Sequence, residues 1–535
     1  MNFMFRFQHV LIFIIFSLFY SEVINASTID NVKNECLVKD VSSYQWGVRH
    51  VANLPADLEL KPGAIIEKCF TVKGVGKHPL ILNAKGISIS VNGSVPVSDQ
   101  PLEIQEGDTL RVRVQVYNKY NSTLTHRLTF EETDSQRRRK IYRIIWNSQT
   151  VNTPRKPKTW YLGPSRQHRQ LKEILHQLVA GDTVYLDPNA VYEPVEIKNI
   201  SGTKELPIRL IGNTKDAGSR PIFAGGTERF NWTLALRNSH NWRIDNIILQ
   251  DGGLCFRNEA TNTELKNVVV RRCSTGVLST DLNSGNFTMS NVEVTESGGK
   301  KNGRPWGHAV YVASDQHAFP GSVFVLKNSY LHGNRGNIVK SRFENSLIQN
   351  NWIESGSDRQ AKYLLELIGY DQKYDFAGQQ FEVKNNIIFM RPPGLGSRVG
   401  GDGNSGSRGD VLFENNLFLI DKGFERTILR TFQGIRSITL RNNSVAFVGS
   451  YSKLLWLTDE ISDSNWVEGR PHITFENNVT TEDSILLKRD EVTTSDDRSF
   501  VIVHDSLELA PIITSIENIQ KLRPQKGEYI EIASF

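Results

Sequence analysis

The sequence predicts an all-β protein: a right-handed parallel β-helix, or solenoid, preceded by a small antiparallel β-sandwich, with one short capping helix. Three observations predict this architecture. One strand template recurs nine times between about residue 240 and residue 480, which is typical of a repeat fold. Before it, about a hundred residues alternate between apolar and polar positions in short runs, as half-buried strands do. Only one segment, between these two regions, has helical spacing.

Residues 1–26 have the features of a secretory signal peptide. Arg6 provides a cation, an apolar run extends from Val10 to Tyr20, and Ala26 is a small residue at the expected cleavage site. No later stretch approaches the roughly 20 apolar residues that a membrane span needs. We therefore expect a secreted or periplasmic protein with no membrane span.

The composition excludes several classes of protein. Of the 535 residues, 39% are hydrophobic and 23% charged, with 40 Gly and 19 Pro, unlike a disordered chain, a collagen or a multi-span membrane protein. The net charge of +5 permits a polyanionic partner, but it is far from the concentrated basic stripe of a nucleic-acid binder. We expect a monomer that binds no nucleic acid.

Four cysteines are too few for a disulfide framework in so long a chain. Export would allow Cys36 to pair with Cys69. For Cys255 and Cys273, a bridge and two buried thiols are both open. The absence of CxxC and HExxH motifs argues against a structural zinc site or a zincin.

The N-terminal strands predict a β-sandwich domain over residues 27–147. Segments such as AIIEKCFTV, LTHRLTFEE and KIYRIIW alternate and are separated by turn residues, the pattern of an antiparallel sandwich. The segment SVNGSVPVSDQPLEIQEGDTLRVRVQV resembles the immunoglobulin-like modules that precede catalytic regions in exported carbohydrate enzymes. A basic, Pro-containing linker is expected over residues 148–160.

The helical segment SRQHRQLKEILHQLVAGD follows this linker. Leu171, Ile174, Leu175 and Leu178 recur at helical spacing, and Gly181 supplies a stop. Strand-like sequence takes over directly afterwards. We therefore expect a short helix that covers the exposed end of the stacked sheets and prevents edge pairing.

The repeat predicts the β-helix domain over residues 161–485, followed by a C-terminal capping tail over residues 486–535. Each copy has an apolar alternating strand that runs into Asn and then into another apolar strand, with steps of 21 to 37 residues. Variable loops on a minimum coil length are typical of a parallel β-helix. We expect the shared asparagines to stack in a buried amide ladder: Asn246, Asn267, Asn291, Asn328, Asn350, Asn385, Asn415, Asn442 and Asn477.

Three consecutive coils bring together side chains that could carry chemistry. We align the strands HAVYV, NIVKSR and YLLEL, so that their apolar residues point inward. Tyr311, Lys340 and Glu366 then point outward, one above another at about 4.8 Å. Arg342 lies two residues further along this face, and His308 lies near its start, so we expect one solvent-facing patch.

This set of residues suits β-elimination on a uronic-acid polymer. The reaction requires neutralisation of the carboxylate, a base near the proton and a donor for the departing oxygen. We assign Lys340 as the base, Arg342 as the group that neutralises the carboxylate, and Tyr311 or His308 as the proton donor. The expected partner is therefore an acidic polysaccharide.

The coils, and especially GNIVKSRFENSLIQNNWIESG, resemble the right-handed β-helix polysaccharide lyases of the pectate-lyase-like superfamily. The KS followed by an Asn-rich turn is similar to the alginate and chondroitin lyase group, in which a lysine at this motif is the base and an arginine on the next coil is the acid. The resemblance implies that Lys340 is the base. The next coil here is KYLLELIG, with no arginine at the matching position.

Four further residues are candidates for substrate binding. Arg359 and Lys362 lie in a loop near the KS motif, and Glu366 lies on the next coil. Arg398 lies in the Gly-rich segment Gly394–Asp410, which we expect to be a mobile loop beside the groove. The sequence assigns no metal ligand and no definite cofactor, and it leaves Ca²⁺ open.

Four other interpretations remain. A β-helix glycoside hydrolase would need two carboxylates about 5 to 10 Å apart, and Glu366 has no such partner at the matching position of the flanking coils. An epimerase shares the elimination chemistry, but the DPHD motif of mannuronan epimerases is missing. A non-catalytic binder of matrix polysaccharide needs only the fold. Finally, Lys340 and Glu366 could form a cross-strand ion pair and nothing more.

Overall fold

The computed structural model describes the greater part of the sandwich and β-helix regions. The described residues are 39–40, 51–53, 57–72, 80–105, 107–117, 122–133, 139–150, 155–226, 231–301, 304–305, 307–316, 318–356, 360–369, 379–392, 394–401, 409–421, 425–432, 435–447, 453–459, 472–480, 484–489, 501–502 and 507–509. The predicted signal peptide and Cys36 lie outside them.

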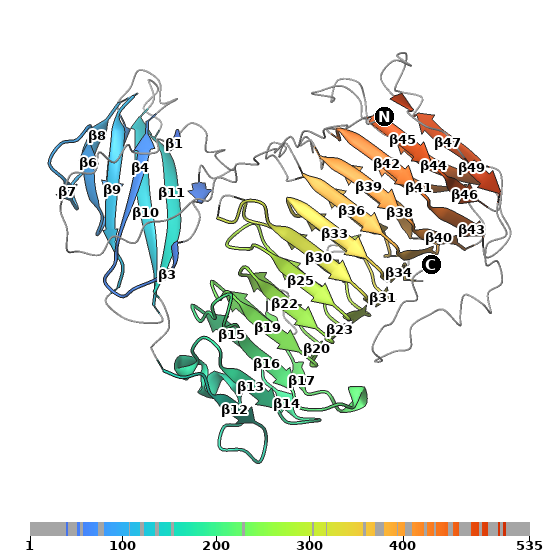
Figure 1. Ribbon diagram of the computed structural model, residues 1–535, viewed down its shortest axis with the longest axis horizontal. Coiled ribbons are helices and arrows are strands. Elements are labelled where there is room, and N and C mark those ends of the chain that lie inside the picture. Colours follow the sequence, from blue (N-terminus) through green and yellow to red (C-terminus); the bar gives the residue numbers. More distant parts are fainter. Residues whose placement is uncertain are drawn as a thin grey trace, which may run out of the picture.

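The N-terminal domain is a sandwich of two sheets (Figure 1). Its apolar positions alternate along each strand, and the inward residues of both sheets form one core that includes Phe70, Leu82, Leu110 and Trp146. One sheet has the order β1 (Lys39–Asp40), β4 (Ile65–Thr71), β9 (Thr109–Gln115), β6 (Ser88–Val91), β7 (Val97–Ser98). The other has β2 (Val51–Asn53), β11 (Arg139–Thr150), β10 (Thr123–Thr133), β5 (Leu80–Ala84), β8 (Leu102–Ile104), with β3 (Asp57–Leu60) also paired to β11.

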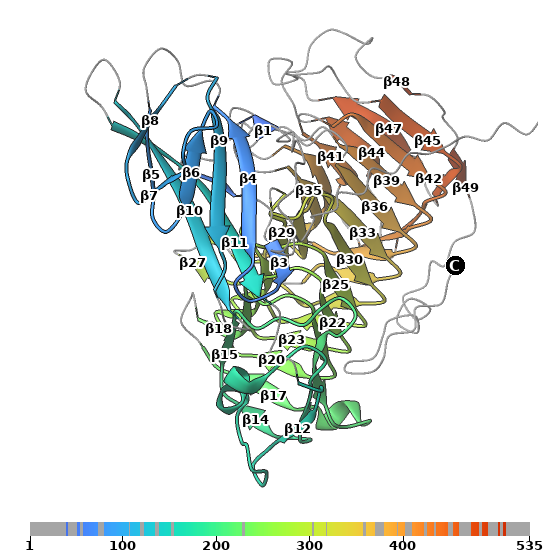
Figure 2. The same cartoon turned by 60° about the vertical axis from the view of Figure 1, so that its left-hand side comes forward.

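The rest of the described chain is a parallel β-helix of three long sheets, in which each coil adds one strand to each sheet (Figures 1 and 2). Sheet 1 consists of β12 (Thr159–Leu162), β13 (Thr183–Leu186), β16 (Ile208–Gly212), β19 (Trp242–Asp245), β22 (Thr263–Lys266), β25 (Phe287–Ser290), β30 (Val323–Lys327), β33 (Asn345–Gln349), β36 (Gln380–Lys384), β39 (Asp410–Glu414), β42 (Ser437–Arg441), β45 (His472–Glu476) and β48 (Val501–Ile502).

Sheet 2 consists of β14 (Val191–Tyr192), β17 (Ile222–Ala224), β20 (Ile248–Gln250), β23 (Val269–Arg271), β26 (Glu293–Thr295), β31 (Tyr330–His332), β34 (Trp352–Glu354), β37 (Ile387–Met390), β40 (Leu417–Ile420), β43 (Ser444–Phe447), β46 (Asn478–Thr480) and β49 (Leu507–Leu509). Sheet 3 consists of β15 (Val195–Lys198), β18 (Trp232–Arg237), β21 (Leu254–Glu259), β24 (Thr275–Ser279), β29 (Val310–Ala313), β32 (Val339–Arg342), β35 (Tyr363–Ile368), β38 (Leu395–Gly400), β41 (Glu425–Thr431), β44 (Lys453–Asp459) and β47 (Ser484–Arg489). A short hairpin of β27 (Lys300–Lys301) and β28 (Arg304–Pro305) projects from one loop.

The β-helix interior is a continuous apolar core, because residues at equivalent positions of successive coils stack on one another. Phe287 and Phe324, which are register partners in sheet 1, have ring centroids 5.8 Å apart. Phe256 and Phe343, from the side of sheet 3, pack against this pair at 5.9 and 5.7 Å. All four side chains are buried. This stacking fixes the register of the strands, and the register places the outward-facing side chains.

The asparagine ladder exists, but most of its rungs are not the predicted asparagines, although Asn291 does donate its side-chain amide to Asn267 at 3.2 Å. The nine shared asparagines adopt the left-handed conformation at the turn from sheet 1 to sheet 2, with φ between 51° and 59°, a region that Asn tolerates well. The buried ladder is formed by the next residue in five of these coils. The rungs of this ladder are Asn351, Asn386, Asn416, Asn443 and Asn478. The side-chain oxygen of each rung after the first accepts hydrogen bonds from the backbone N–H and from the side-chain amide of the rung before it.

The predicted capping helix is not an α-helix. The segment forms two single turns of 3₁₀ helix, η2 (Leu171–Glu173) and η3 (Leu175–Gln177). Leu171, Ile174 and Leu178 are buried and belong to the β-helix core. A 3₁₀ turn has about three residues per turn, so this apolar spacing suits it as well.

The domains meet through long strands and direct contacts. Strand β11 continues to Thr150, inside the expected linker, and β12 begins at Thr159. Asn147 donates its amide to the side-chain oxygen of Asn283 at 3.2 Å, and Ser201 donates to Gln149 at 3.1 Å. At the other end, β48 and β49 extend sheets 1 and 2 beyond residue 485, and the remainder of the expected C-terminal tail lies outside the described residues.

Cysteines support both domains. Cys255 and Cys273 form a disulfide between adjacent coils of the β-helix, with a Cα–Cα distance of 5.8 Å. The sequence leaves a disulfide and two buried thiols open for this pair, and the structure contains the disulfide. Cys69 in the sandwich is also disulfide-bonded.

Candidate active site

The candidate site lies on the outer face of sheet 3, where the predicted register is confirmed. Tyr311 pairs with Lys340 and Lys340 with Glu366 across β29, β32 and β35. Their inward neighbours Val310, Val339 and Leu365 are core residues, so the alternation of strand side chains directs the polar residues outward.

The row continues with two arginines on the next coils. Glu366 pairs with Arg398 on β38, and Arg398 pairs with Arg430 on β41. The backbones of these two arginines are therefore about 4.8 Å apart. Like charges on directly opposed residues destabilise a sheet unless an anion lies between them.

Glu366 is the centre of the site. Its Oε2 lies 3.1 Å from the Lys340 ammonium nitrogen, and its Oε1 lies 2.5 Å from Arg398 Nη1. The Asn337 side-chain amide also donates to Oε2. The Glu366 side chain is only 4% exposed, so a buried carboxylate is fixed by two cations and an amide, as the burial of a charge requires.

Tyr311 lies beside two cations. The Lys340 ammonium nitrogen is 5.4 Å and the Arg342 guanidinium carbon 5.7 Å from the centre of its ring, within the range of cation–π attraction. Cations near a phenol also favour its phenolate form over the neutral hydroxyl. Tyr311 is half-buried, which leaves part of the ring open to solvent.

His308 completes the group. Its ring centroid is 5.4 Å from that of Tyr311, with the two rings nearly perpendicular. The backbone N–H of Asn337 donates to His308 Nδ1 at 3.2 Å. Because this N–H can only donate, Nδ1 is the accepting nitrogen, and the neutral imidazole carries its proton on Nε2.

The expectation of a solvent-facing patch was wrong. The Lys340 side chain is 11% exposed, and Arg342 and Glu366 are buried. The sequence alignment gave the direction in which these side chains point, but it could not show that they pair with one another and with Arg398 and so shield each other from water. The simple ion-pair interpretation also does not suffice, because two cations, Lys340 and Arg398, meet one carboxylate.

The other predicted residues divide into three groups. Arg398 joins the cluster from β38, so the N-terminal half of the expected mobile loop is a strand. Lys362 is exposed immediately before β35, and the structure places it at the edge of the site region. Arg359 lies outside the described residues.

Sequence reasoning missed Asn337 and Arg430. Asn337 is the first residue of the aligned segment NIVKSR, three residues before Lys340, but the alternation of that segment assigns it no role. Arg430 occupies the same position in ILRTF as Arg398 does in LGSRVG. The alternation of these two strands was a usable signal, but the long intervening loops hid the coil boundaries.

The structure adds no metal ligands to this site. Within the described ranges, no group of three or more His, Cys, Asp or Glu side chains is arranged to hold a metal ion. Ca²⁺ therefore stays a prediction from sequence. The described part of the chain also contains no helix with the length and apolar character that a membrane crossing requires.

The chain was compared with known proteins. No family model and no curated protein matches the chain. Among solved structures, a rhamnogalacturonan lyase is 14% identical with a TM-score of 0.44, covering 71% of this chain and 96% of its own. An alginate lyase from Paenibacillus sp. str. FPU-7 is 13% identical with a TM-score of 0.37, covering 62% and 98%. The pectate lyase Pel9A is 12% identical with a TM-score of 0.36, covering 64% and 82%.

The three parallel sheets define the chain as a parallel β-helix protein with an N-terminal β-sandwich. The three solved structures named above are polysaccharide lyases with TM-scores below 0.5. The function therefore has to be argued from the site itself.

Proposed function

We propose that the protein is an exported polysaccharide lyase that cleaves an acidic, uronic-acid-containing polysaccharide by β-elimination on the outer face of sheet 3. The observation that carries the proposal is a cluster of cations beside a tyrosine and a histidine: Lys340 and Arg398 contact the carboxylate of Glu366, and Arg342 lies beside the ring of Tyr311, next to His308. The cluster has an excess of positive charge, which suits an anionic sugar.

β-Elimination has three requirements. A base removes the proton from the carbon that bears the carboxylate, the electron pair forms a carbon–carbon double bond, and the bond to the glycosidic oxygen breaks. The departing oxygen takes up a proton from a donor. Negative charge grows on the uronate carboxylate during the first step, so fixed cations there stabilise the transition state.

The geometry favours a different base from the one expected. Lys340 donates to Glu366 at 3.1 Å, and an ammonium group in an ion pair has no free lone pair to accept a proton. We therefore assign Lys340, Arg342 and Arg398 to the substrate carboxylate. Tyr311 becomes the base, because its side chain lies directly beside these cations and is partly open to solvent, so that it can reach the proton next to a carboxylate held there.

His308 is the proposed proton donor to the leaving oxygen. Its Nδ1 accepts from the backbone of Asn337, so Nε2–H is the group that can donate. The proton that Tyr311 removes and the proton that His308 supplies are thus handled by two side chains of one coil, Tyr311 on β29 and His308 just before it. This arrangement separates the general base from the general acid.

A non-catalytic polysaccharide binder is the second candidate. The adjacent Arg398 and Arg430 favour it, because a row of guanidinium groups along the coils can hold successive carboxylates of a polymer without any proton transfer. Binding alone would not need the tyrosine and histidine beside the cations.

The test uses purified protein and a panel of acidic polysaccharides, with ultraviolet absorbance reporting the unsaturated uronate. Tyr311→Phe should lower turnover at least about a hundredfold, because the ring stays and only the hydroxyl is lost. Lys340→Arg should retain more activity than Tyr311→Phe, since a cation suffices at that position. Lys266→Ala, at an exposed position on sheet 1, is the control and should be near wild type.

Two results would contradict the assignment. If Tyr311→Phe kept near-native turnover, Tyr311 would not be the base. If Lys340→Arg lost all activity while Tyr311→Phe did not, the expected lysine base would be restored. Binding of an acidic polymer without any cleavage would favour the binder.

A further inference from the structure

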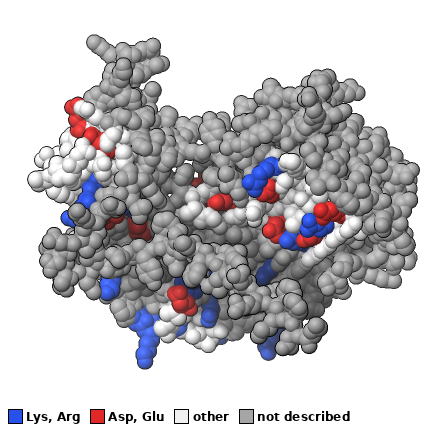
Figure 3. All heavy atoms as spheres, turned by 45° about the horizontal axis from the view of Figure 1, so that its top comes forward, with Lys and Arg blue, Asp and Glu red and all other residues white. Residues whose placement is uncertain are grey.

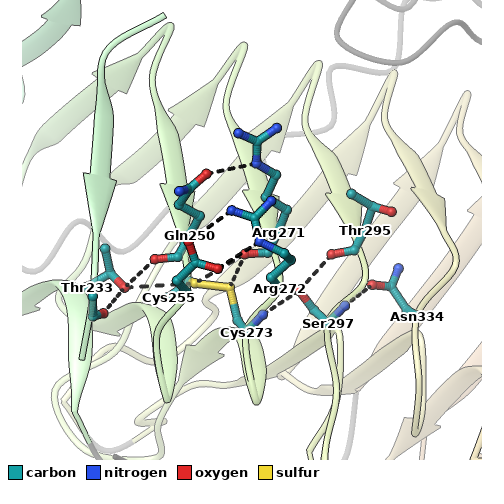
Figure 4. Close-up of a disulfide and its surroundings, with 11 residues drawn as sticks. Thr233, Gln250, Cys255, Arg271, Arg272, Cys273, Thr295, Ser297 and Asn334 are labelled. Carbon is teal, nitrogen blue, oxygen red and sulfur yellow. Dashed lines mark hydrogen bonds and ion pairs between the residues drawn. A yellow bond between two sulfur atoms is a disulfide. The ribbon is translucent and has the colours of Figure 1, made fainter. Parts of the chain in front are cut away.

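A groove on the outer face of sheet 2 is separate from the candidate active site on sheet 3. It encloses about 530 Å³ and is formed by β17, β20, β23 and β26, with the turn η4 (Ala217–Ser219) at its lip. Figure 4 shows its guanidinium side chains next to the Cys255–Cys273 disulfide.

The groove has an apolar track. Ile222, Ile248 and Val269 lie at the same position on three successive strands, in direct register. They point away from the β-helix core, where the neighbouring Phe223, Leu249 and Val270 lie. Ile222 is half-buried, and Ile248 and Val269 are buried at the floor of the groove, with 7% and 6% of their surface exposed. An aliphatic floor is suited to contact with the apolar faces of a ligand that enters the groove.

A charged track runs parallel to the apolar one, and its backbone is strained. Asp251, Arg272 and Glu296 follow three successive strands of sheet 2, and they have φ values of 60°, 55° and 51°. The next coil has Gly333 at this position, with φ 61°. Charged residues with a Cβ are unfavourable in the left-handed region, and strain that a fold retains is often found at functional sites.

The charged track is held in place by its own contacts. Arg272 donates to both carboxylate oxygens of Asp251, at 2.7 and 2.9 Å. Arg271 donates to Gln250 at 2.9 Å, as Figure 4 shows. The disulfide joins the same two coils a few residues further on. The polar groups are therefore organised before any ligand arrives, which lowers the cost of binding.

The charges that line the groove cancel. Three arginines are matched by three acidic residues: Arg220, Arg271, Arg272, Asp216, Glu293 and Glu296. A balanced groove does not select an anion, in contrast to the cation-rich site on sheet 3. Alternating donors and acceptors beside an aliphatic strip suit a ligand with many hydroxyl groups and apolar C–H faces.

We propose that this groove binds a neutral sugar chain along the axis of the β-helix. The C–H faces of the rings contact Ile222, Ile248 and Val269, and the hydroxyl groups exchange hydrogen bonds with Arg272 and Glu296. Because the groove is on another sheet, it is an accessory binding site whose existence does not depend on the proposed lyase activity.

The test is calorimetric titration of the full chain with neutral hexasaccharides: cellohexaose, mannohexaose and maltohexaose. Hexagalacturonate is titrated into Lys340→Ala protein as the charged comparison. Arg272→Asn is the informative variant, because Asn tolerates the left-handed conformation while the guanidinium is removed. Arg436→Asn, at an exposed ion pair with Asp410 on another sheet, is the matched control.

We expect at least one neutral hexasaccharide to bind. Arg272→Asn should weaken that binding at least tenfold without lowering the melting temperature, and Lys340→Ala and Arg436→Asn should bind as the wild type does. The proposal would be overturned if no neutral hexasaccharide bound, or if hexagalacturonate bound this groove instead. It would equally be overturned if Arg272→Asn kept its affinity or if Arg436→Asn lost it to the same extent.

Discussion

At the scale of single residues, burial and pairing decide what the candidate site can do. Glu366 contacts both Lys340 and Arg398, and it is almost inaccessible to water. Such a carboxylate organises its neighbours. The adjacent Tyr311 and His308 are the groups left to exchange protons with a substrate.

We predict that Glu366→Gln destabilises the fold by about 3 kcal/mol, because two largely buried cations lose their counter-charge. Denaturant unfolding measures the change. Glu264→Gln is the control, since its ion pair with Arg243 is partly exposed and should contribute less than about 1 kcal/mol. Equal losses of stability from the two substitutions would show that the buried cations do not depend on the negative charge of Glu366.

A second prediction concerns His240, which is buried in the β-helix. Burial lowers its pKa to about 4, while the unfolded chain binds this proton near pH 6.5. The free energy of unfolding should therefore fall as the pH drops from about 6.5 to about 4, because in this window only the unfolded state is protonated.

Thermal unfolding at several pH values, compared between wild type and His240→Gln, checks this. The variant should show a smaller loss of stability across the window. If both proteins lost stability in parallel, His240 would not be the group responsible. His126 in the sandwich has its pKa lowered by burial to about 4 as well, so some pH dependence should remain in the variant.

At the scale of elements, the asparagine pairs show what sequence can and cannot settle. The repeat revealed the coils, and the Asn-Asn dipeptides marked the turn. The sequence did not show which Asn of each pair points inward. The first Asn is needed because it tolerates the left-handed backbone conformation, and the second because its buried amide joins the ladder. Only the backbone conformation distinguishes them.

Asn415 and Asn416 provide a matched pair for testing this division. Asn416→Ala should reduce the free energy of unfolding by at least about 2 kcal/mol, because it leaves buried groups of both neighbouring rungs unsatisfied. Asn415→Gly should be near neutral, because Gly adopts positive φ freely. Chemical denaturation of both variants decides the matter, and a reversed order of effects would contradict the assignment.

The disulfide between adjacent coils is a further element. Replacing Cys255 and Cys273 together by Ala should lower stability by about 3 kcal/mol, given the 18-residue separation and the entropy of closing such a loop. Unfolding of the double variant under oxidising conditions measures this. A loss below about 0.5 kcal/mol would indicate that stacking alone holds these coils together.

At the scale of the whole molecule, the order of the domains and the β-helix could be predicted because periodicity is a global signal. The register of Tyr311, Lys340 and Glu366 followed from the same alternation. Asn337, Arg430 and the burial of the cluster did not, since they depend on irregular turns and on loops of different length between coils. Figure 3 shows several separate places where Lys or Arg lies next to Asp or Glu on this face, so charge alone does not locate the site.

The proposed function depends on elimination of an acidic polysaccharide at the outer face of sheet 3. The most direct measurement is the mass of the products formed from a purified uronic-acid oligosaccharide. Elimination takes up no water, so the product masses should sum to the substrate mass, and one product should carry a double bond that absorbs ultraviolet light. If the products together weighed one water molecule more and did not absorb, the protein would be a hydrolase, and the proposed mechanism would be contradicted.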